Sequence, residues 1–428
     1  MTMIEMPAVQ TRLTSDEEQI LLRVLREGAT LATGPEGEAF EQEFAAFAGS
    51  DGAVAVNSCS SALELSAVLC GVGKGDEVII PAHTFVSSAV PFARRGAKIV
   101  WADIDPDTAV LSASSVERLL TKRTKAIVVV HLYGLPADMD AILALAEPRG
   151  IKVVEDCAQA PGARYRGRRV GAIGHFGCFS FHTHKNINTL GEGGMLTTRA
   201  EEDAVSARKL RWMGNWPFEV ERKRYWVPAM GNVAPPMADQ WPYNFCLGEP
   251  NAAVGRSLIK RVDGINEQRR KQAARILAAL TDCPQLQFQK VPDDREHAYH
   301  LLAARYDAPA GTTRDDLIQH LLDRYQLKTI VQYWPLHRTP LFQQFGFDRA
   351  EVPESDRWFD NMISFPWWSD MPDATLDDMA ERIVAAIGDV SARAGTAGGR
   401  PAACFDESLR WTPSWRAGWV PTSSDACC

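Results

Sequence analysis

Residues 124–159 read TKAIVVVHLYGLPADMDAILALAEPRGIKVVEDCAQ, and this stretch decides the fold class. The runs at either end are short, apolar and rich in Val and Ile, which favours strands buried on both faces. Residues 139–150, between them, have the length and composition of a helix. A strand, a helix and a strand in this order predict a parallel strand pair with a crossover helix.

The same alternation continues on both sides of this stretch. Residues 76–82 and 98–104 read as strands, residues 84–96 and 114–122 as helices, and residues 177–182 and 193–200 as two further strands. We therefore predict an α/β fold, with a mainly parallel mixed sheet covered by helices on both faces and a site at the strand C-termini. A long amphipathic pattern over 256–280 leads to a smaller α+β region. The predicted domains are an N-terminal segment (1–30), a large domain (31–255), a small domain (256–392) and a disordered Gly/Pro/Ser-rich tail (393–428).

Composition narrows the classes of function. The chain has 428 residues and a net charge of −8, which gives no support to nucleic-acid or anionic-membrane binding. Nine scattered cysteines without a C-x-x-C pair argue against a zinc ribbon or a disulfide scaffold. The chain has no apolar run of membrane-spanning length and no signal-peptide pattern at its N-terminus, so we expect a cytoplasmic protein.

Polar residues cluster where predicted strands end. NSCSSAL, residues 57–63, places hydroxyl groups at a strand-to-helix turn, where backbone amides and Ser60 can bind phosphate. An ordinary helix-capping cluster is the alternative. Asp156 ends an apolar strand, and a carboxylate there needs a cation such as a protonated ring nitrogen; a helix cap or local ion pair is the alternative. Gln159 follows three residues later, and Phe85 after another strand can stack on a flat ring or belong to the core.

A lysine completes the set. Residues 179–194 read FSFHTHKNINTLGEGG, in which Ser180 precedes Lys185 and a glycine cluster follows. Most lysines are solvated surface charges, but a lysine in a partly desolvated pocket can form a Schiff base. His182 and His184 form an H-x-H pair without a third ligand at suitable spacing, so we predict no metal. A phosphate cradle, a carboxylate, an aromatic ring and a lysine together predict pyridoxal 5′-phosphate (PLP) as the cofactor.

The sequence also resembles the DegT/DnrJ/EryC1/StrS sugar aminotransferases, a branch of the fold type I PLP enzymes. The resemblance spans about Ala32 to Val390 in the family's order. The stretches that carry it are TGPEGEAFEQEFAAF (33–47), AVNSCSSALELSAVLCGVGKGDEVIIPAHTFVSSA (55–89), VVHLYG (129–134), VVEDCAQAPGA (153–163), SFHTHKNINTLGEGGMLTT (180–198), YNFCLGEPNAAVG (243–255), VQYWPLH (331–337) and FPWW (365–368).

This resemblance implies a role for each matching residue. Lys185 matches the lysine that holds PLP as an internal aldimine and shuttles the proton, and Asp156 matches the acid that keeps the pyridine nitrogen protonated. Asn244 matches an asparagine that reaches the phosphate from the partner subunit, so a homodimer with shared active sites is implied. The implied cofactor contacts are Cys59, Ser60, Phe85, Asp156, Gln159, Ser180, Lys185 and Asn244. The candidate substrate contacts are His184, Tyr333 and His337.

Three positions depart from the family's pattern. Cys59-Ser60 stands where the family usually has Gly-Thr, which retains a hydroxyl but adds a Cβ at the turn. The segment 215–242, with Trp216, Trp226 and Trp241, is a longer insertion, either a substrate wall, a dimer contact or a structural loop. Pro250 stands where helix-friendly residues are usual.

The expected activity is a ping-pong transamination from glutamate or glutamine to a keto-sugar, which the resemblance implies to be nucleotide-linked. Some relatives carry His at the lysine position and act as dehydrases, so the retained Lys185 favours transamination. The alternatives are a PLP-dependent sugar dehydratase, an aminotransferase for a cyclitol ketone, a PLP-binding regulatory protein, and a metal protein that uses His182 and His184.

Overall fold

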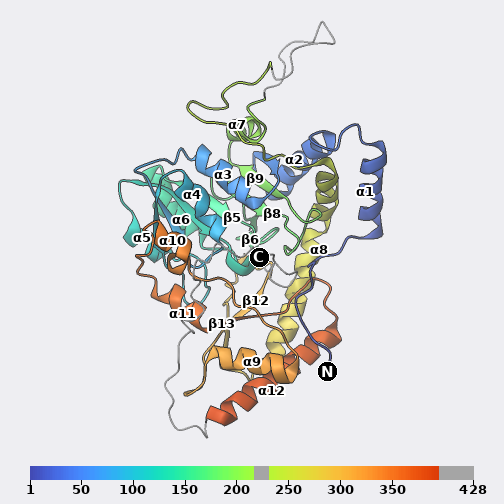
Figure 1. Ribbon diagram of the computed structural model, residues 1–428, viewed down its shortest axis with the longest axis vertical. Coiled ribbons are helices and arrows are strands. Elements are labelled where there is room, and N and C mark those ends of the chain that lie inside the picture. Colours follow the sequence, from blue (N-terminus) through green and yellow to red (C-terminus); the bar gives the residue numbers. More distant parts are fainter. Residues whose placement is uncertain (216–230, 395–428) are drawn as a thin grey trace, which may run out of the picture.

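The computed structural model describes residues 1–215 and 231–394 (Figure 1). The large sheet has seven strands in the order β1-β9-β8-β5-β4-β2-β3. Their bounds are β1 Gly52–Val56, β2 Glu77–Pro81, β3 Lys98–Ala102, β4 Thr124–Val130, β5 Lys152–Asp156, β8 Phe176–Ser180 and β9 Gly194–Thr198. Strands β8, β5, β4, β2 and β3 pair in parallel, whereas β9 is antiparallel to both of its neighbours. The predicted α/β class with a mainly parallel mixed sheet is confirmed.

Helices cover both faces of this sheet. Consecutive residues of a strand point to opposite faces, and both faces carry apolar side chains that the helices bury. On β8, the Phe179 ring lies 4.9 Å from the ring of Phe44 on helix α2. The preceding residue, Cys178, interacts instead with Ser66 on helix α3. Among the helices of this half are α2 Pro35–Ala48, α3 Cys59–Leu69, α4 Val90–Arg94, α5 Ala113–Leu119, α6 Met139–Ala146 and α7 Glu201–Arg211.

The predicted helix over 84–96 is broken in two. A short 3-10 turn at Val86–Ser88 precedes α4, which has Pro91 in its first turn. Proline has no amide hydrogen to donate, so it is tolerated at a helix start and not in its interior. The break has a consequence for the site, because it turns the buried Ser88 toward the end of β5.

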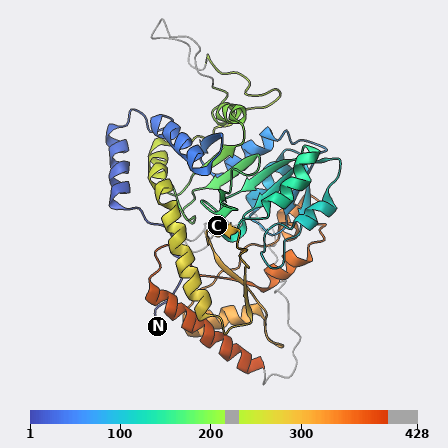
Figure 2. The same ribbon diagram turned by 180° about the vertical axis from the view of Figure 1, so that it is seen from behind.

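Helix α8, Glu249–Ala279, runs from the half of the molecule that holds the large sheet into the other half (Figures 1 and 2). It begins seven residues before the predicted start, with Pro250 in its first turn. The Glu249 carboxylate accepts hydrogen bonds from the amides of Glu36 and Gly37, at 2.9 and 2.8 Å, and thereby ties α8 to α2. The predicted boundary between residues 255 and 256 falls inside this continuous helix.

A second core, called here the smaller lobe, surrounds a three-stranded sheet of order β10-β12-β13. Its elements are β10 Leu286–Phe288, β12 Leu302–Tyr306, β13 Met362–Phe365, α9 Arg314–Tyr325 and α12 Asp373–Ala394. Helices α10 Pro340–Gln344 and α11 Pro353–Asn361 lie between α9 and β13 in the chain. The first two residues of the predicted tail complete α12, and residues 395–428 lie outside the described residues, as do Trp216 and Trp226.

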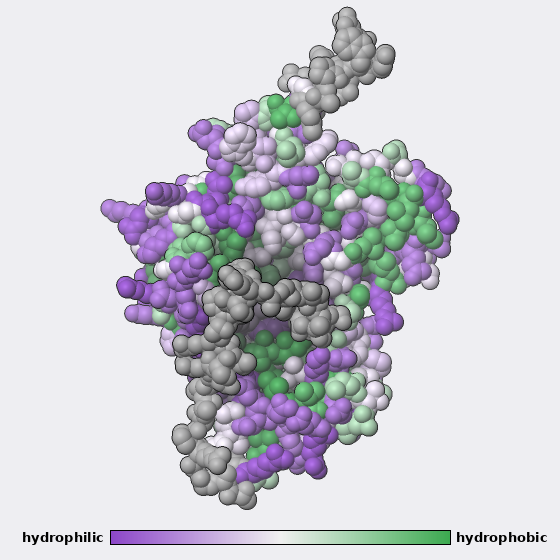
Figure 3. All heavy atoms as spheres, in the orientation of Figure 1, coloured by the Kyte–Doolittle hydropathy of each residue, from purple (hydrophilic) through white to green (hydrophobic). Residues whose placement is uncertain are grey.

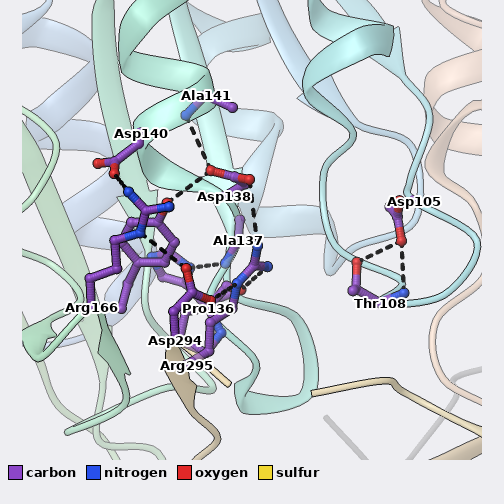
Figure 4. A network of polar contacts seen from close by, with 12 residues as sticks. Asp105, Thr108, Pro136, Ala137, Asp138, Asp140, Ala141, Arg166, Asp294 and Arg295 are labelled. Carbon is purple, nitrogen blue, oxygen red and sulfur yellow. Dashed lines mark hydrogen bonds and ion pairs between the residues drawn. The ribbon is translucent and has the colours of Figure 1, made fainter. Parts of the chain in front are cut away.

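Between β10 and β12 the chain returns to the large domain and forms a charged network with it, shown in Figure 4. Strand β6 (Arg164–Tyr165) pairs with β7 (Arg168–Arg169) and with β11 (Arg295–Glu296). Arg166, at the turn, pairs with Asp140 on α6 and with Asp294, and Arg295 donates to the carbonyl of Pro136 at 2.9 Å. The network therefore fixes the segment after α8 against the start of α6.

Helix α1, Ser15–Glu27, begins directly after Thr14, because Thr14 and Glu17 form a capping box. It packs along α8, and its outward face exposes Leu22 and Leu25. Figure 3 shows apolar surface gathered on this flank of the molecule. In the part of the chain that the structure describes, no helix is long and apolar enough to span a bilayer.

Candidate active site

A cavity of about 660 Å³ opens where several strands of the large sheet end. Seven of the residues predicted from sequence line it: Cys59, Ser60, Phe85, Asp156, Gln159, Ser180 and Lys185. They come from the C-terminal ends of β5 and β8, the N-terminus of α3 and the turn after β2. This convergence matches the expectation that parallel strands place their site at the carboxyl edge.

Asp156 is a buried carboxylate without a cationic side chain at ion-pair distance among the described residues. Ser88 Oγ donates to Asp156 Oδ2 at 2.7 Å, the Ala158 amide donates to Oδ1 at 3.1 Å, and Cys59 Sγ lies 4.0 Å from Oδ1. Burial raises the pKa of Asp156, while these hydrogen bonds and the charge of Lys185 oppose the rise. A buried anion of this kind is stabilised by a cation, and the protonated pyridine nitrogen of PLP supplies one.

The N-terminus of α3 lines part of the cavity. Ser58 caps the helix by accepting from the Ser61 amide at 3.1 Å, and Ser60 Oγ lies 2.8 Å from Ser87 Oγ. A Cβ added at Gly194 would lie 2.4 Å from the carbonyl carbon of Ser58, so β9 approaches this turn closely enough to require glycine. Exposed amides and hydroxyls at a helix N-terminus suit the phosphate of PLP.

Lys185 lies on the loop between β8 and β9, called here the lysine loop (residues 181–193). Backbone hydrogen bonds close its base, from Phe181 N to Gly193 O at 2.8 Å and from Thr183 N to Gly191 O at 3.0 Å. Gly191 has φ +110°, a conformation that side chains other than hydrogen disfavour. Gly191 therefore permits a sharp turn in the loop, as Gly194 permits the close approach of β9 to Ser58.

Gln159 lines the cavity, and Tyr333 packs against two of the lining residues. Gln159 Oε1 accepts from the Tyr133 amide at 2.6 Å, and its Nε2 donates to the Tyr333 hydroxyl at 3.2 Å. The Phe85 and Tyr333 rings meet edge to face, with centroids 5.8 Å apart. Tyr333 thus lies beside two predicted cofactor contacts, where a substrate bound against the cofactor would meet it.

Like Tyr333, three other predicted residues are absent from the lining of this cavity in the single chain. Asn244 is exposed and pairs with Trp212 in an isolated bridge. His337 is buried, with Nε2 3.5 Å from Asp356, and His184 lies beside His182, with ring centroids 5.2 Å apart. Their roles toward cofactor and substrate stay predictions.

Sequence reasoning missed the supporting residues of the site. Ser88 and Glu192 were not singled out, although Ser88 contacts Asp156 and Glu192 lines the cavity. Burial raises the pKa of Glu192. The only signal for Ser88 was the hydroxyl run after Phe85, and a hydroxyl pattern does not show which distant carboxylate it contacts.

Within the described residues, the structure brings no group of three potential metal ligands together at His182 and His184. Within residues 1–215 and 231–394, the one group of three potential ligand atoms joins His131, Glu155 and Cys157. His131 Nε2 lies 3.0 Å from Glu155 Oε2, and His131 Nδ1 accepts from the Ala137 amide. Backbone amides also donate to both oxygens of Glu155, so this buried cluster is already satisfied by hydrogen bonds.

Comparison with known proteins provides further evidence about the family of this chain. The sequence profile of the DegT/DnrJ/EryC1/StrS aminotransferase family matches residues 11–384. The spore coat polysaccharide biosynthesis protein SpsC of Bacillus subtilis is 38% identical over 372 residues, which cover 83% of this chain and 91% of that protein. The dTDP-3-amino-3,4,6-trideoxy-alpha-D-glucose transaminase of Streptomyces venezuelae is 35% identical over 364 residues, covering 85% and 90%.

Solved structures show the same likeness. An aminotransferase from Psychrobacter cryohalolentis superposes with a TM-score of 0.82 at 29% identity, covering 90% of this chain and 99% of that one. DesV of S. venezuelae gives a TM-score of 0.74 at 34% identity, covering 89% and 94%.

Proposed function

Because the chain belongs to the DegT/DnrJ/EryC1/StrS aminotransferase family and is a PLP-dependent transaminase, we propose that it aminates the keto group of a nucleotide-linked sugar, with glutamate or glutamine as donor. The sugar in the name of the S. venezuelae relative is dTDP-linked, which supports a nucleotide-linked acceptor. The name of SpsC supports a place in polysaccharide biosynthesis.

The single observation that carries the proposal is the shared cavity of Lys185, Asp156 and the α3 N-terminus. When bound, PLP supplies an electron-accepting ring. Asp156 would hold the ring nitrogen protonated, the amides at the start of α3 and Ser60 would bind the phosphate, and Phe85 would pack on the ring. Lys185 Nζ would carry the cofactor and move the proton at the substrate carbon.

The test combines labelling with product analysis. Borohydride reduction and peptide mapping should place the cofactor on Lys185, and the Lys185→Ala variant should lose transamination. A panel of nucleotide-linked keto-sugars, free keto-sugars and cyclitol ketones, each with glutamate or glutamine, should yield an amino sugar by mass spectrometry. Loss of water without amine transfer would instead indicate a dehydratase, and an aminated cyclitol would replace the sugar assignment. Cofactor binding without any turnover would favour a regulatory protein.

We further propose a homodimer in which Asn244 reaches the phosphate of the partner's site. Exposed apolar side chains surround Asn244, with Trp241 exposed by 90% and Trp212 and Met213 by 44% each, and such surface is typical of an interface. Light scattering should give the mass of two chains.

Mixed subunits test the sharing of sites. Lys185→Ala and Asn244→Ala should each be weakly active alone, yet a mixed dimer contains one site with both native residues. Refolding the two together should restore about a quarter of wild-type activity for random pairing. If the mixture stays as weak as the separate variants, Asn244 does not act across the interface.

A further inference from the structure

The lysine loop is anchored by residues far from its own strand pair. Asn186, directly after Lys185, is fully buried, and its amide group donates to the carbonyl of Ala298 at 2.9 Å and to Asn266 Oδ1 at 3.2 Å. Its Oδ1 lies 3.2 Å from Nδ1 of His300. These contacts hold the Asn186 side chain, but they leave its backbone carbonyl for another partner.

That partner belongs to the N-terminal strap, which we define as residues 4–11. At one end, Ile4 exchanges backbone hydrogen bonds of 2.9 Å with Gln326 and Lys328 of the smaller lobe. At the other end, Thr11 Oγ1 donates to the carbonyl of Asn186 at 2.7 Å, and the carbonyl of Thr11 accepts from Asn188 Nδ2 at 2.9 Å. Figures 1 and 2 both place the N-terminus near α12 and α1 near the opposite end of α8, so the strap runs between the two cores.

A directed chain of hydrogen bonds ends on this carbonyl. Arg269 Nη1 donates to Ser369 Oγ at 2.8 Å, and Ser369 Oγ lies 2.9 Å from Thr11 Oγ1. Since the Thr11 proton goes to Asn186, the Ser369 proton goes to Thr11. The order is therefore Arg269 to Ser369 to Thr11 to the carbonyl of Asn186, and each hydroxyl donates one bond and accepts one.

The start of the chain is a buried guanidinium. Arg269 on α8 is 0% exposed, and no carboxylate within the described residues lies at ion-pair distance from it. Its other donors reach the carbonyls of Tyr299 and His300, at 2.7 and 3.0 Å, and Gln10 Oε1 at 3.3 Å. Burial lowers the pKa of Arg269 to about 9, so it remains cationic at neutral pH. A cation at the head of a hydroxyl chain polarises each bond along it.

We propose that Arg269, Ser369 and Thr11 form a positioning relay that fixes the backbone beside Lys185 and couples the smaller lobe to the lysine loop. Arg269 comes from α8, Ser369 follows β13 of the smaller lobe, and Thr11 ends the strap. All three are more than nine-tenths buried, so removing either hydroxyl leaves a largely buried donor or acceptor without its partner. Thr11 and Ser369 also border a pocket of about 400 Å³, which is separate from the active-site cavity. A displacement of either lobe reaches the Lys185 backbone through two hydroxyl groups.

The relay acts on the rate more than on substrate binding. Lys185 Nζ moves a proton at the substrate carbon, and a misplacement of about 1 Å can lower such a rate about 100-fold. Thr11 and Ser369 do not line the active-site cavity, so they do not contact a substrate bound there. Loss of the relay should therefore lower kcat while KM changes little.

The test compares Thr11→Val, which removes the hydroxyl and retains the shape, with Thr11→Ser, which retains the hydroxyl. In the cofactor-loaded enzyme we expect Thr11→Val to lower kcat about 10- to 100-fold with KM within about 3-fold, and Thr11→Ser to stay near wild type. Two readouts besides activity should also change in Thr11→Val alone: the pH midpoint of the visible absorbance of lysine-bound cofactor, and amide hydrogen exchange of residues 182–190 in the cofactor-free protein. Thr281→Val is the matched control, because it removes an exposed threonine hydroxyl that donates to the carbonyl of Ala278.

Ser369→Ala and the Thr11→Val/Ser369→Ala double variant complete the cycle. A relay that acts as one unit makes the double variant no slower than the worse single variant, whereas independent packing effects multiply. Ser369→Ala also supplies the test if Thr11→Val does not fold. The proposal is overturned if hydroxyl removal leaves kcat, the absorbance midpoint and exchange unchanged, or if Thr11→Ser fails as severely as Thr11→Val. It rests on Lys185 being the cofactor-bearing lysine, and borohydride labelling of the wild type tests that assignment separately.

Discussion

Ser88→Ala gives the sharpest test of how Asp156 is held. Ser88 Oγ donates to Asp156 Oδ2 at 2.7 Å, and both residues are buried. The variant leaves this carboxylate with one strong donor, the Ala158 amide at 3.1 Å, and a thiol at 4.0 Å. A hydrogen bond to a charged group contributes about 1.5–3 kcal/mol, which corresponds to about a 10- to 100-fold change in an equilibrium.

The direction of the pKa change follows from which form of Asp156 loses the hydrogen bond. Ser88 stabilises the anionic form of Asp156, so its removal raises the pKa of Asp156 further above its ordinary value. A protonated Asp156 cannot hold the ring nitrogen of PLP as a cation. The acid limb of the kcat/KM profile should therefore move to higher pH, and on that limb kcat/KM should fall about 10- to 100-fold.

The assay is the pH profile of the transamination between pH 5 and 9, measured with the absorbance spectrum at each pH. Ser114→Ala is the control, because Ser114 is exposed and its hydroxyl bonds only to Ser112 on the surface. An acid limb of Ser88→Ala that superposes on the wild type would refute the assignment of Ser88 to Asp156.

Two further predictions concern stability. Gly255→Ala should destabilise the fold by about 1–3 kcal/mol in urea unfolding, because the new Cβ would lie 2.5 Å from the buried Phe40 ring. Gly264→Ala in the same helix meets nothing within 4 Å and should stabilise by up to about 1 kcal/mol; equal signs for the two variants would contradict the packing of α8 on α2. Burial lowers the pKa of His83 and His297 to about 3 each, from an ordinary 6.5, so the unfolded chain binds protons more readily than the folded one. The contribution of the two neutral histidines to the free energy of unfolding should be full above about pH 6.5 and should decrease as the pH drops toward 3. The slope should reach up to about 1.4 kcal/mol per pH unit for each histidine. Equal urea unfolding midpoints at pH 7 and pH 5 would exclude this contribution.

The fold was predictable from sequence because its signals are local. Val and Ile runs such as 126–130 alternate with helical stretches, and the parallel sheet follows from that alternation. The exceptions were local conflicts. Pro91 broke one predicted helix, and the start of α8 was misplaced because Pro250 was read as a departure when it occupies the first turn.

The residues of the site divide in the same way, into those with a local signal in the sequence and those without one. Asp156 stands out in the sequence as a charged residue at the end of an apolar strand, and Lys185 as a lysine between such a strand and a glycine cluster. The structure brings both to one cavity. Cys59 was flagged for its added Cβ, but its contact with Asp156, 97 residues away, is visible only in three dimensions. No periodicity relates two such positions.

The positioning relay is the extreme case of that limit. Thr11 and Asn186 are 175 residues apart, and Thr11 and Ser369 are 358 apart. Each is a small polar residue of a kind that is common on surfaces and in turns, so composition and spacing favour the solvated interpretation. What distinguishes Thr11 is the simultaneous burial of both partners, since a buried hydroxyl must give and receive its hydrogen bonds within the protein. The strand-end residues determine which reaction is possible, and the distant hydroxyls hold the reacting amine in place. Substitutions at those hydroxyls should therefore impair catalysis without any contact to cofactor or substrate.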